Sequence, residues 1–264
     1  MESLNNPENL LFKDLEGKQA QLQDVIDDGL EGEYEHRVPA LVELLDCGEP
    51  YYQLLACVML TSWGNYSGFQ KLIDWASNPE NIPWKDMLVV YERISEADSA
   101  FEMLADGLKT SFYCQENQKL EQLQIEAIKA LLSIYHQQYF GRTLALAIVR
   151  NKSVASNVKN EIIAAIKTSM AILQQNRPME FDLAFQVASL LTPLAHLDDR
   201  ITAFYANQLI NNYSQNERVL RELTYILGGG KSSATFEVLQ HLKNLEIPHL
   251  KNYVENAMAR RLDH

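Results

Sequence analysis

Apolar residues recur along most of this chain at the spacing that places them on one face of a helix. They stand at i, i+3, i+4 and i+7 in one segment after another, and no stretch keeps the two-residue alternation of a β-strand. The pattern predicts an all-α protein of about a dozen helices. The predicted helices cover residues 18–28, 37–46, 51–63, 66–78, 84–95, 98–112, 119–138, 141–151, 157–175, 181–197, 200–214, 217–227, 235–245 and 248–262.

The clearest pair of helices lies in residues 37–63, on either side of a tight turn. Leu41 and Leu44 belong to the apolar stripe of the first helix, and a second stripe starts directly after the turn. Gly48 suits the end of the first helix, and Pro50 suits the first turn of the second, where its missing N–H costs nothing. Because neither helix can bury its apolar face alone, the pair is typical of a stacked helical array.

Short segments of similar pattern recur at a nearly constant interval. The starts at positions 52, 87, 123 and 158 lie 35, 36 and 35 residues apart, and later starts at 219 and 250 lie 31 apart. The register is least regular between residues 176 and 214, where we expect Pro193 to interrupt a helix. The nine-residue segments begin at Tyr52, Leu123, Val158 and Leu250, with weaker copies at Met87 and Val219.

This recurring segment resembles the second helix of HEAT repeats. It reads as an apolar residue, a basic or amide residue, a small apolar residue, and later Ala before an apolar position; LKNYVENAMARRL at the C-terminal end matches best, followed by VKNEIIAAI. The resemblance covers most of residues 36–262. It implies an α-solenoid of antiparallel helix pairs over residues 36–264, preceded by an acidic lead-in and helix over residues 1–35.

The sequence departs from the HEAT pattern in two respects. The spacing of 31–36 residues is shorter than the roughly 40–47 residues of HEAT units, while the Trp–Gly–Tyr pattern of TPR repeats is absent. The usual Arg after the first apolar position is also missing, which puts a regular Asp–Arg ladder between repeats in doubt. That position holds Gln53, Gln124, Lys159 and Lys251.

Acidic residues are concentrated at the N-terminal end of the chain. Residues 1–50 hold 13 Asp and Glu against 3 Lys and Arg, a net charge of −10, whereas the other 214 residues hold 22 against 20. Such an end repels phosphate backbones and attracts basic surfaces, so we expect a basic protein partner and no nucleic acid. An ordinary solvated helix end, kept acidic for solubility, would give the same pattern.

The candidate partner-binding residues are carboxylates and tyrosines of this acidic end. We expect the carboxylates to neutralise Lys and Arg side chains of the partner and the tyrosines to anchor the contact. The candidates are Asp27, Asp28, Glu31, Glu33, Glu35, Asp46, Glu49, Tyr51 and Tyr52.

Aromatic residues crowd into the stretch that follows. They form interface hot spots when they are exposed within a polar rim, but Trp63 and Trp75 stand at a helical spacing that suits a core between repeats equally well. Tyr51 and Tyr52 are adjacent and face different sides of a helix, so both cannot be buried easily. The crowded residues are Tyr51, Tyr52, Trp63, Tyr66, Trp75 and Trp84.

No motif with catalytic or metal-binding spacing is complete. GGGKSS at 228–233 lacks the first Gly of a phosphate-binding loop, because that position is Tyr225; we expect a helix end whose glycines supply positive φ. The segment 24–35 lacks the EF-hand order, since Ile26 stands where an oxygen ligand is needed. Glu33-x-x-His36 has the spacing of di-iron bundles, but its second copy at 246–249 contains a proline.

The remaining chemistry-bearing residues favour a structural role. Cys47, Cys57 and Cys114 are few and odd in number, which suits reduced, packed thiols, and C-x-x-C, H-E-x-x-H and G-x-S-x-G are all absent. The histidines are scattered over predicted helices. We therefore expect no enzyme activity, metal or cofactor. The chain also lacks an apolar run of membrane-spanning length and a signal-peptide pattern, which predicts a cytoplasmic protein with no membrane partner.

These features favour a non-enzymatic module that binds another protein. Among small, acidic, helical proteins, immunity proteins that block a basic nuclease toxin fit best, and some of them are HEAT-like. One alternative is a HEAT-like scaffold or a phycobilin-lyase-type chaperone acting on a partner, which would need a pocket for a tetrapyrrole. A DNA glycosylase-type HEAT enzyme would need a basic concave face, which the net charge of −2 over residues 51–264 disfavours.

Overall fold

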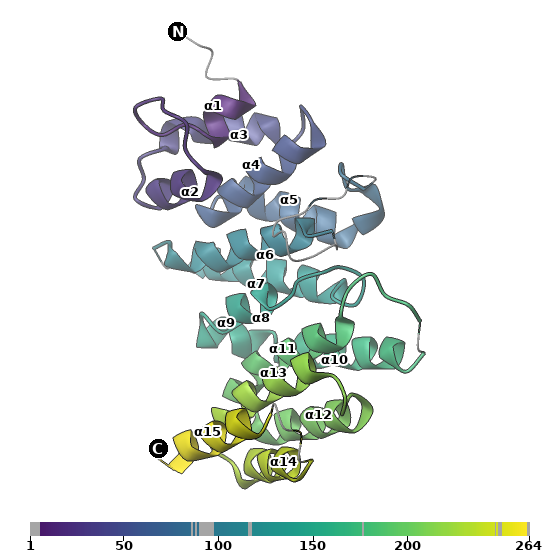
Figure 1. The fold of residues 1–264 in the computed structure, drawn as a ribbon. Coiled ribbons are helices and arrows are strands. Elements are labelled where there is room, and N and C mark those ends of the chain that lie inside the picture. The colour runs from purple at the N-terminus through teal and green to yellow at the C-terminus, as the bar shows by residue number, and fades with distance from the viewer. Residues whose placement is uncertain are drawn as a thin grey trace. The chain divides into compact units, whose positions relative to one another are not determined.

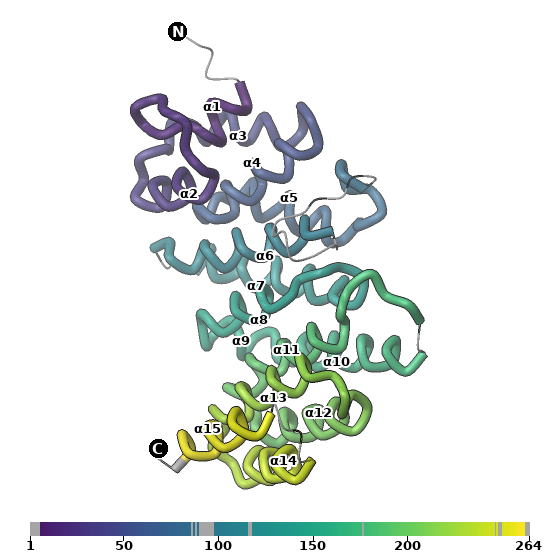
Figure 2. Tube along the Cα trace, viewed as in Figure 1, coloured from purple at the N-terminus to yellow at the C-terminus, as the bar shows by residue number. Residues whose placement is uncertain are grey.

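The chain folds into helices that pack in two compact units. The computed structural model describes residues 6–85, 87, 89, 98–115, 118–175, 177–245, 247 and 250–262 (Figure 1). These residues form fifteen α-helices, three short 3-10 helices and no β-strand, and they include one isolated bridge between Lys13 and Gln19. The prediction of an all-helical protein is confirmed. Contacts divide the chain into Met1–Arg150 and Asn151–His264, and Figure 2 shows the path of each part.

The first unit contains the first eight α-helices. They are α1 (Pro7–Leu11), α2 (Leu22–Leu30), α3 (Val38–Leu44), α4 (Pro50–Ser62), α5 (Tyr66–Ser77), α6 (Ala100–Thr110), α7 (Gln118–Ser133) and α8 (Thr143–Ile148), with 3-10 helices η1 (Glu35–Arg37), η2 (Pro79–Asn81) and η3 (Ser111–Tyr113). Helix α1 packs against α3 and α4, and α2 packs against α4, inside this unit.

Helix α4 is the central element of the first unit. It packs against α3, α5 and α6, and the nine residues from Leu54 to Ser62 are all buried. A helix that is apolar on every side is stable only when neighbours cover every side. Helix α6 continues the row by packing against α8, while α5 packs against α7.

In the turn between α3 and α4, the glycine and the proline have the positions that the sequence predicted. Gly48 has a φ of 104°, which a residue with a Cβ rarely adopts, and Pro50 is the first residue of α4. At the other end Gly64 has a φ of 70°, and the Asn65 amide donates to the Leu60 carbonyl at 2.9 Å. This pattern is typical of a helix that ends in a left-handed glycine.

The second unit contains seven further α-helices. They are α9 (Lys152–Asn157), α10 (Lys159–Leu173), α11 (Leu183–Leu197), α12 (Asp199–Asn212), α13 (Glu217–Gly228), α14 (Ser233–Asn244) and α15 (Lys251–Leu262). Helix α13 packs against α11 on one side and α15 on the other, and α12 packs against α14. Helix α11 runs through the buried Pro193, contrary to our expectation of an interruption, because packing on α10, α12 and α13 offsets the lost backbone hydrogen bond.

A regular repeat relates the helices of the second unit. Helices α11, α13 and α15 begin at residues 183, 217 and 251, and α12 and α14 begin at 199 and 233, so equivalent helices are 34 residues apart. The residues that cap these helices keep the same spacing: Asp182 and Asn216 before α11 and α13, and Asp198 and Ser232 before α12 and α14. Each cap side chain accepts the amide of the third residue after it.

The interval of 35–36 residues read from the sequence follows different helices. Its segments begin in α4 and α7 and beside α10, while most of the segment from Met87 lies outside the described residues. Helix α4 packs on α6, whereas α7 packs on α5, so the segments at 52 and 123 are not in equivalent helices. The helix predicted at 84–95 also lies mostly outside the described residues, although Trp84 and Lys85 belong to a turn.

The glycine-rich turn between α13 and α14 is a helix end, as predicted, but for a different reason. None of Gly228, Gly229 and Gly230 has a positive φ. A Cβ on Gly228 would lie 3.0 Å from the Ala257 Cβ, and one on Gly230 would lie 2.5 Å from the Thr235 hydroxyl oxygen. Glycine is therefore required by close packing and not by backbone conformation.

Within the described residues, no helix combines the length and the apolar character needed to cross a membrane.

Candidate partner-binding site

A buried tyrosine holds the acidic segment that follows α2. Tyr34 is 1% exposed, its ring centroid lies 4.0 Å from the Arg37 guanidinium carbon, and its hydroxyl donates to Asp28 Oδ2 at 3.3 Å. Burial raises the pKa of Tyr34, and the positive charge of Arg37 opposes this rise. The buried Tyr34 therefore anchors the middle of the segment between α2 and α3 in the core of the first unit.

Arg37 joins this segment to the N-terminal helix. Its buried guanidinium donates to the carbonyls of Leu10 and Lys13, both at 2.9 Å, and of Asp14 at 3.3 Å. Burial lowers the pKa of Arg37, and the three carbonyls replace the water that the cation loses. Because this guanidinium is committed to the interior, it does not neutralise the carboxylates on the surface.

Trp63 fixes α2 against the C-terminal end of α4. Its Nε1 donates to the Ile26 carbonyl at 2.9 Å, and its ring stacks on Tyr34 with centroids 6.2 Å apart and planes 16° from parallel. Gly29 permits this approach, since a Cβ there would lie only 2.1 Å from Cε2 of Trp63. The tryptophan is half-buried, so part of its surface remains open to solvent.

Beside Trp63 the first unit has a groove of about 510 Å³. Its lining includes Glu35 from the acidic segment, the exposed ring of Tyr66, which is 64% exposed, and the thiol of Cys114. The thiol donates to the Ser62 carbonyl at 3.3 Å, and burial raises its pKa, so it is neutral at pH 7. The groove therefore combines aromatic, apolar and acidic surface.

Five exposed carboxylates lie in the second half of α2 and in the segment that follows it, and one of them, Glu35, lines this groove. Asp27 accepts a hydrogen bond from Gln23 Nε2 at 2.7 Å and Asp28 accepts one from Tyr34. No ion pair with a Lys or Arg of the described residues neutralises any of the five. The five are Asp27, Asp28, Glu31, Glu33 and Glu35.

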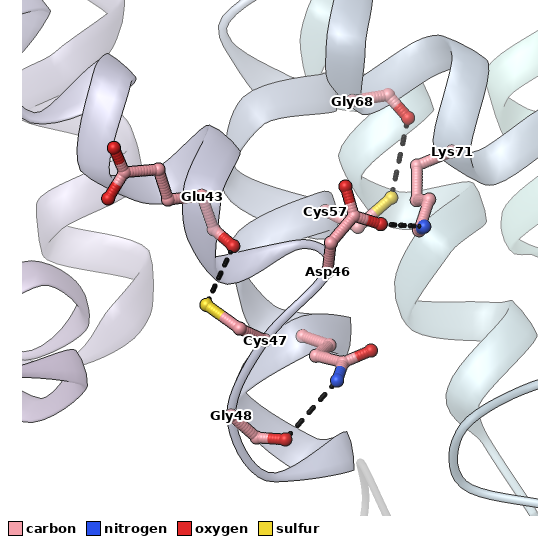
Figure 3. A network of polar contacts seen from close by, with 8 residues as sticks. Glu43, Asp46, Cys47, Gly48, Cys57, Gly68 and Lys71 are labelled. Carbon is pink, nitrogen blue, oxygen red and sulfur yellow. Dashed lines mark hydrogen bonds and ion pairs between the residues drawn. The ribbon is translucent and has the colours of Figure 1, made fainter.

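The other four candidate residues lie around the turn between α3 and α4. Asp46 forms an ion pair with Lys71 of α5, which Figure 3 shows close to the turn. The Tyr52 hydroxyl donates to Glu8 Oε1 at 2.6 Å, and Glu49 stands at the N-cap position of α4, where its side chain makes no capping hydrogen bond. Tyr51 is 40% exposed, so of the two adjacent tyrosines it offers the more accessible ring.

The nine candidate residues therefore form two groups and not one site. The contacts of Trp63 place the α2 group at the C-terminal end of α4, whereas Asp46 to Tyr52 surround its N-terminal end. Because α4 has 13 residues, its two ends are about 20 Å apart. Only the first group adjoins the groove, and it keeps its charge unpaired, so it is the better candidate.

The aromatic stretch divides between the core and the surface. Trp75 and Trp84 pack edge to face with centroids 4.6 Å apart, and both are buried, which assigns them to the core. Trp63 and Tyr66 line the groove. Sequence reasoning did not single out Tyr66 or Cys114 as site residues; for Tyr66 the available signal was Gly64, whose positive φ turns the chain between Trp63 and Tyr66.

The other candidate features do not assemble a reactive centre in the described part of the chain. No three His, Cys, Asp or Glu side chains there come together in a way that could hold a metal ion, and Glu246 and His249 of the second Glu-x-x-His lie outside it. All three cysteines are free. Cys47 is exposed and donates to the Glu43 carbonyl (Figure 3), so the expectation of packed thiols is wrong for this residue.

Comparison with known proteins does not assign this site: no family model, no curated protein and no solved structure matches the chain.

Proposed function

We propose that the chain is a non-enzymatic protein-binding module built from HEAT-like helix pairs. Within the first unit α4, α6 and α8 follow one another in contact while α5 packs on α7, and within the second unit α11, α13 and α15 form a row beside α12 and α14. Alternating contacts of this kind are typical of stacked helical repeats, which bind partners through surface complementarity. The 34-residue spacing in the second unit supports the same architecture.

The partner we propose is a basic protein that binds at the groove beside Trp63. The observation that carries this proposal is the set of five exposed carboxylates, without ion pairs among the described residues, of which Glu35 lines the groove together with Trp63 and Tyr66. A Lys or Arg side chain of the partner can meet the carboxylates and lie over Trp63 or Tyr66 in a cation–π contact. Paired and partly desolvated charges of this kind favour fast and specific association.

Of the roles open to such a module, we propose that of an immunity protein that blocks a nuclease toxin. A nuclease needs a basic surface to hold the phosphates of its substrate, and an acidic module that covers this surface prevents substrate from binding. The inhibitor then needs no chemistry of its own, which fits a site composed of carboxylates and aromatic rings.

The decisive experiment combines isolation of the partner with an activity assay. The tagged protein is purified from its native host, the co-purified protein is identified, and its nuclease activity is measured with and without the tagged protein. Stoichiometric inhibition of a basic nuclease is the expected result. A co-purified protein without nuclease activity would refute the immunity role, and failure of any basic protein to bind would refute the docking proposal.

Charge-reversed variants locate the contact. The triple change Glu31→Lys, Glu33→Lys and Glu35→Lys should weaken binding of the basic partner by about a hundredfold or more, because attraction becomes repulsion. The control carries Glu180→Lys, Glu237→Lys and Glu255→Lys, three exposed carboxylates of the second unit with the same total change in charge. Equal loss of affinity in both variants would show that net charge alone matters and that the groove is not the docking site.

A further inference from the structure

The second unit has a groove whose charge is opposite to that of the first. It has a volume of about 380 Å³ and is lined by residues of α11, α13 and α15 and of the glycine-rich turn. Its polar lining includes Lys231, Arg260 and His196, and none of the described residues that line it is Asp or Glu. No ion pair with a described carboxylate neutralises Lys231 or Arg260. The groove therefore presents uncompensated positive charge in a chain with a net charge of −12.

The carboxylate that contacts this turn, that of Asp199, already accepts hydrogen bonds from the turn's own backbone. Asp199 Oδ2 accepts the backbone amides of Lys231 and Ser232, both at 2.8 Å. The amides that a phosphate-binding loop would offer to its ligand are thus used internally. The Lys231 side chain is exposed and is not held by this contact, so it can turn toward the groove.

A second arginine, Arg261, holds the turn in place through hydrogen bonds. Arg261 donates to the carbonyls of Leu227 and Ser232 at 3.1 and 2.7 Å and to the Thr235 hydroxyl at 2.9 Å. Its neighbour Arg260 makes none of these contacts and is exposed at the groove. The adjacent guanidinium groups therefore differ in role: one fixes the turn and the other faces solvent.

Close packing sets the position of Arg260. A Cβ on Gly228 would lie 3.0 Å from the Ala257 Cβ and 3.2 Å from Arg260 Nη2, so glycine lets the guanidinium lie against the end of α13. The negative end of the helix dipole favours a cation there. The Arg260 guanidinium carbon is 5.9 Å from the ring centroid of Tyr225, which is 64% exposed and lines the same groove.

We propose that this groove binds a small anion that carries both a phosphate group and a flat ring, the chemistry of a nucleoside monophosphate. Arg260 and Lys231 hold the phosphate, with His196 as a further donor, and the ring stacks on Tyr225. The volume lies in the range of small-ligand sites, and apolar atoms of Ala195 and Ile226 complete the lining. All these residues belong to the second unit, so the proposal does not depend on the function proposed for the acidic groove.

The test is a titration of the full-length protein by isothermal calorimetry with adenosine monophosphate, adenosine and inorganic phosphate. Adenosine monophosphate should bind more tightly than either fragment. No saturable heat with any of the three at about 10 mM would overturn the proposal, since such a site would be weaker than ordinary small-ligand sites. Equal binding of phosphate and adenosine monophosphate would overturn the role of Tyr225.

Single substitutions assign the contacts. Arg260→Gln and Lys231→Gln should each weaken adenosine monophosphate binding by about tenfold or more, as expected for a lost charge-assisted hydrogen bond. Tyr225→Ala should weaken adenosine monophosphate binding by at least about fivefold and leave phosphate binding unchanged. The controls Arg177→Gln and Lys243→Gln remove exposed cations that do not line the groove and should bind like the wild type. Wild-type affinity in Arg260→Gln and Lys231→Gln would refute the site.

Discussion

At the scale of single residues, the acidic groove depends on a few positions where only one side chain fits. Gly29 leaves room for the indole of Trp63, and Arg37 supplies the donors that three backbone carbonyls need. Arg37 is buried, whereas Gly29 also lines the groove. They act by fixing the segment that carries the carboxylates, so their substitution affects the site through the fold.

Gly29→Ala should destabilise the protein by about 1–3 kcal/mol, the usual cost of an overpacked core position. The added methyl group would lie 2.1 Å from the Trp63 ring, which must move and strain its hydrogen bond to Ile26. Denaturant unfolding measured by circular dichroism gives the change in free energy. In the control Gly229→Ala the new Cβ meets nothing closer than 3.5 Å, and unfolding should change little. Equal stability of the two variants would contradict the packing argument.

The buried thiol of Cys57 should make the protein less stable at alkaline pH. Burial raises its pKa from the usual 9.0 to about 12. Between these values the unfolded chain has lost the thiol proton and the folded chain keeps it, so the free energy of unfolding falls as pH rises, by about 1.4 kcal/mol per pH unit. This contribution is fully present below pH 9 and lost toward pH 12.

Denaturant unfolding at several pH values between 8 and about 11 tests this prediction by comparison of the wild type with Cys57→Ala. The variant lacks the thiol and should show a shallower decline in stability. Cys47→Ala removes an exposed thiol and should decline as steeply as the wild type. Parallel declines in all three proteins would contradict the assignment to Cys57.

At the scale of helices, the second unit is organised by capping residues at a spacing of 34. Asp182, Asp198, Asn216 and Ser232 each begin a helix and accept an amide three residues later. Buried positions keep the same register, since Leu220 and Leu223 of α13 correspond to Val254 and Ala257 of α15. The caps and the packed face thus repeat together.

Asn216→Ala should lower the free energy of unfolding by about 0.5–2 kcal/mol, because the Val219 amide loses its acceptor at the start of α13. Asn216→Asp keeps an acceptor and adds a negative charge at a helix N-terminus, so it should be at least as stable as the wild type. Thermal unfolding measures both. Asn211→Ala, an exposed position inside α12, is the control and should not destabilise. Loss of stability in Asn216→Asp would contradict the capping role.

Periodicity predicted the longer helices and, within 141–151, the six-residue α8, but it missed α1 and α9. Helices α1 and α9 have five and six residues and fewer buried apolar side chains than α8, so no apolar stripe stands out in them. Their signals are local instead, because Asn6 and Asn151 are caps whose side chains accept amides two residues later. The 34-residue repeat of the second unit was missed because the aligned segments at 219 and 250, 31 residues apart, do not start at equivalent positions of α13 and α15.

The candidate site was only partly readable from the sequence. Charge clustering identified the carboxylates of residues 27–35 without structural information. It could not show that Asp46 would pair with Lys71, 25 residues later, or that Trp63 would reach the Ile26 carbonyl, 37 residues earlier. Such long-range contacts decide which charges stay unpaired, and no local pattern encodes them.

At the scale of the whole molecule, charge is divided between the two units. The first unit holds 24 Asp and Glu against 11 Lys and Arg, and the second holds 11 against 12, giving net charges of −13 and +1. The unit that carries the acidic groove therefore accounts for all of the formal net charge of −12. This asymmetry is expected to orient an approaching basic protein toward the first unit.

The rate of association with the proposed basic partner should fall by about tenfold or more between 50 mM and 500 mM salt, because ions screen the attraction between the two surfaces. Stopped-flow or surface-binding kinetics measures this rate, and the dissociation rate should change much less. The variant with lysine at positions 31, 33 and 35 should lose most of this salt dependence. A wild-type rate that does not change with salt would contradict electrostatic attraction.

The different settings of the three tryptophans have a practical consequence. Trp75 and Trp84 are enclosed in the core, whereas Trp63 is half-buried at the acidic groove. A ligand that covers the indole of Trp63 removes water from it and should shift its emission to shorter wavelength, while the two enclosed indoles contribute a constant background. Natural fluorescence can thus report occupancy of the groove without a label, and a protein with phenylalanine in place of Trp63 supplies the blank.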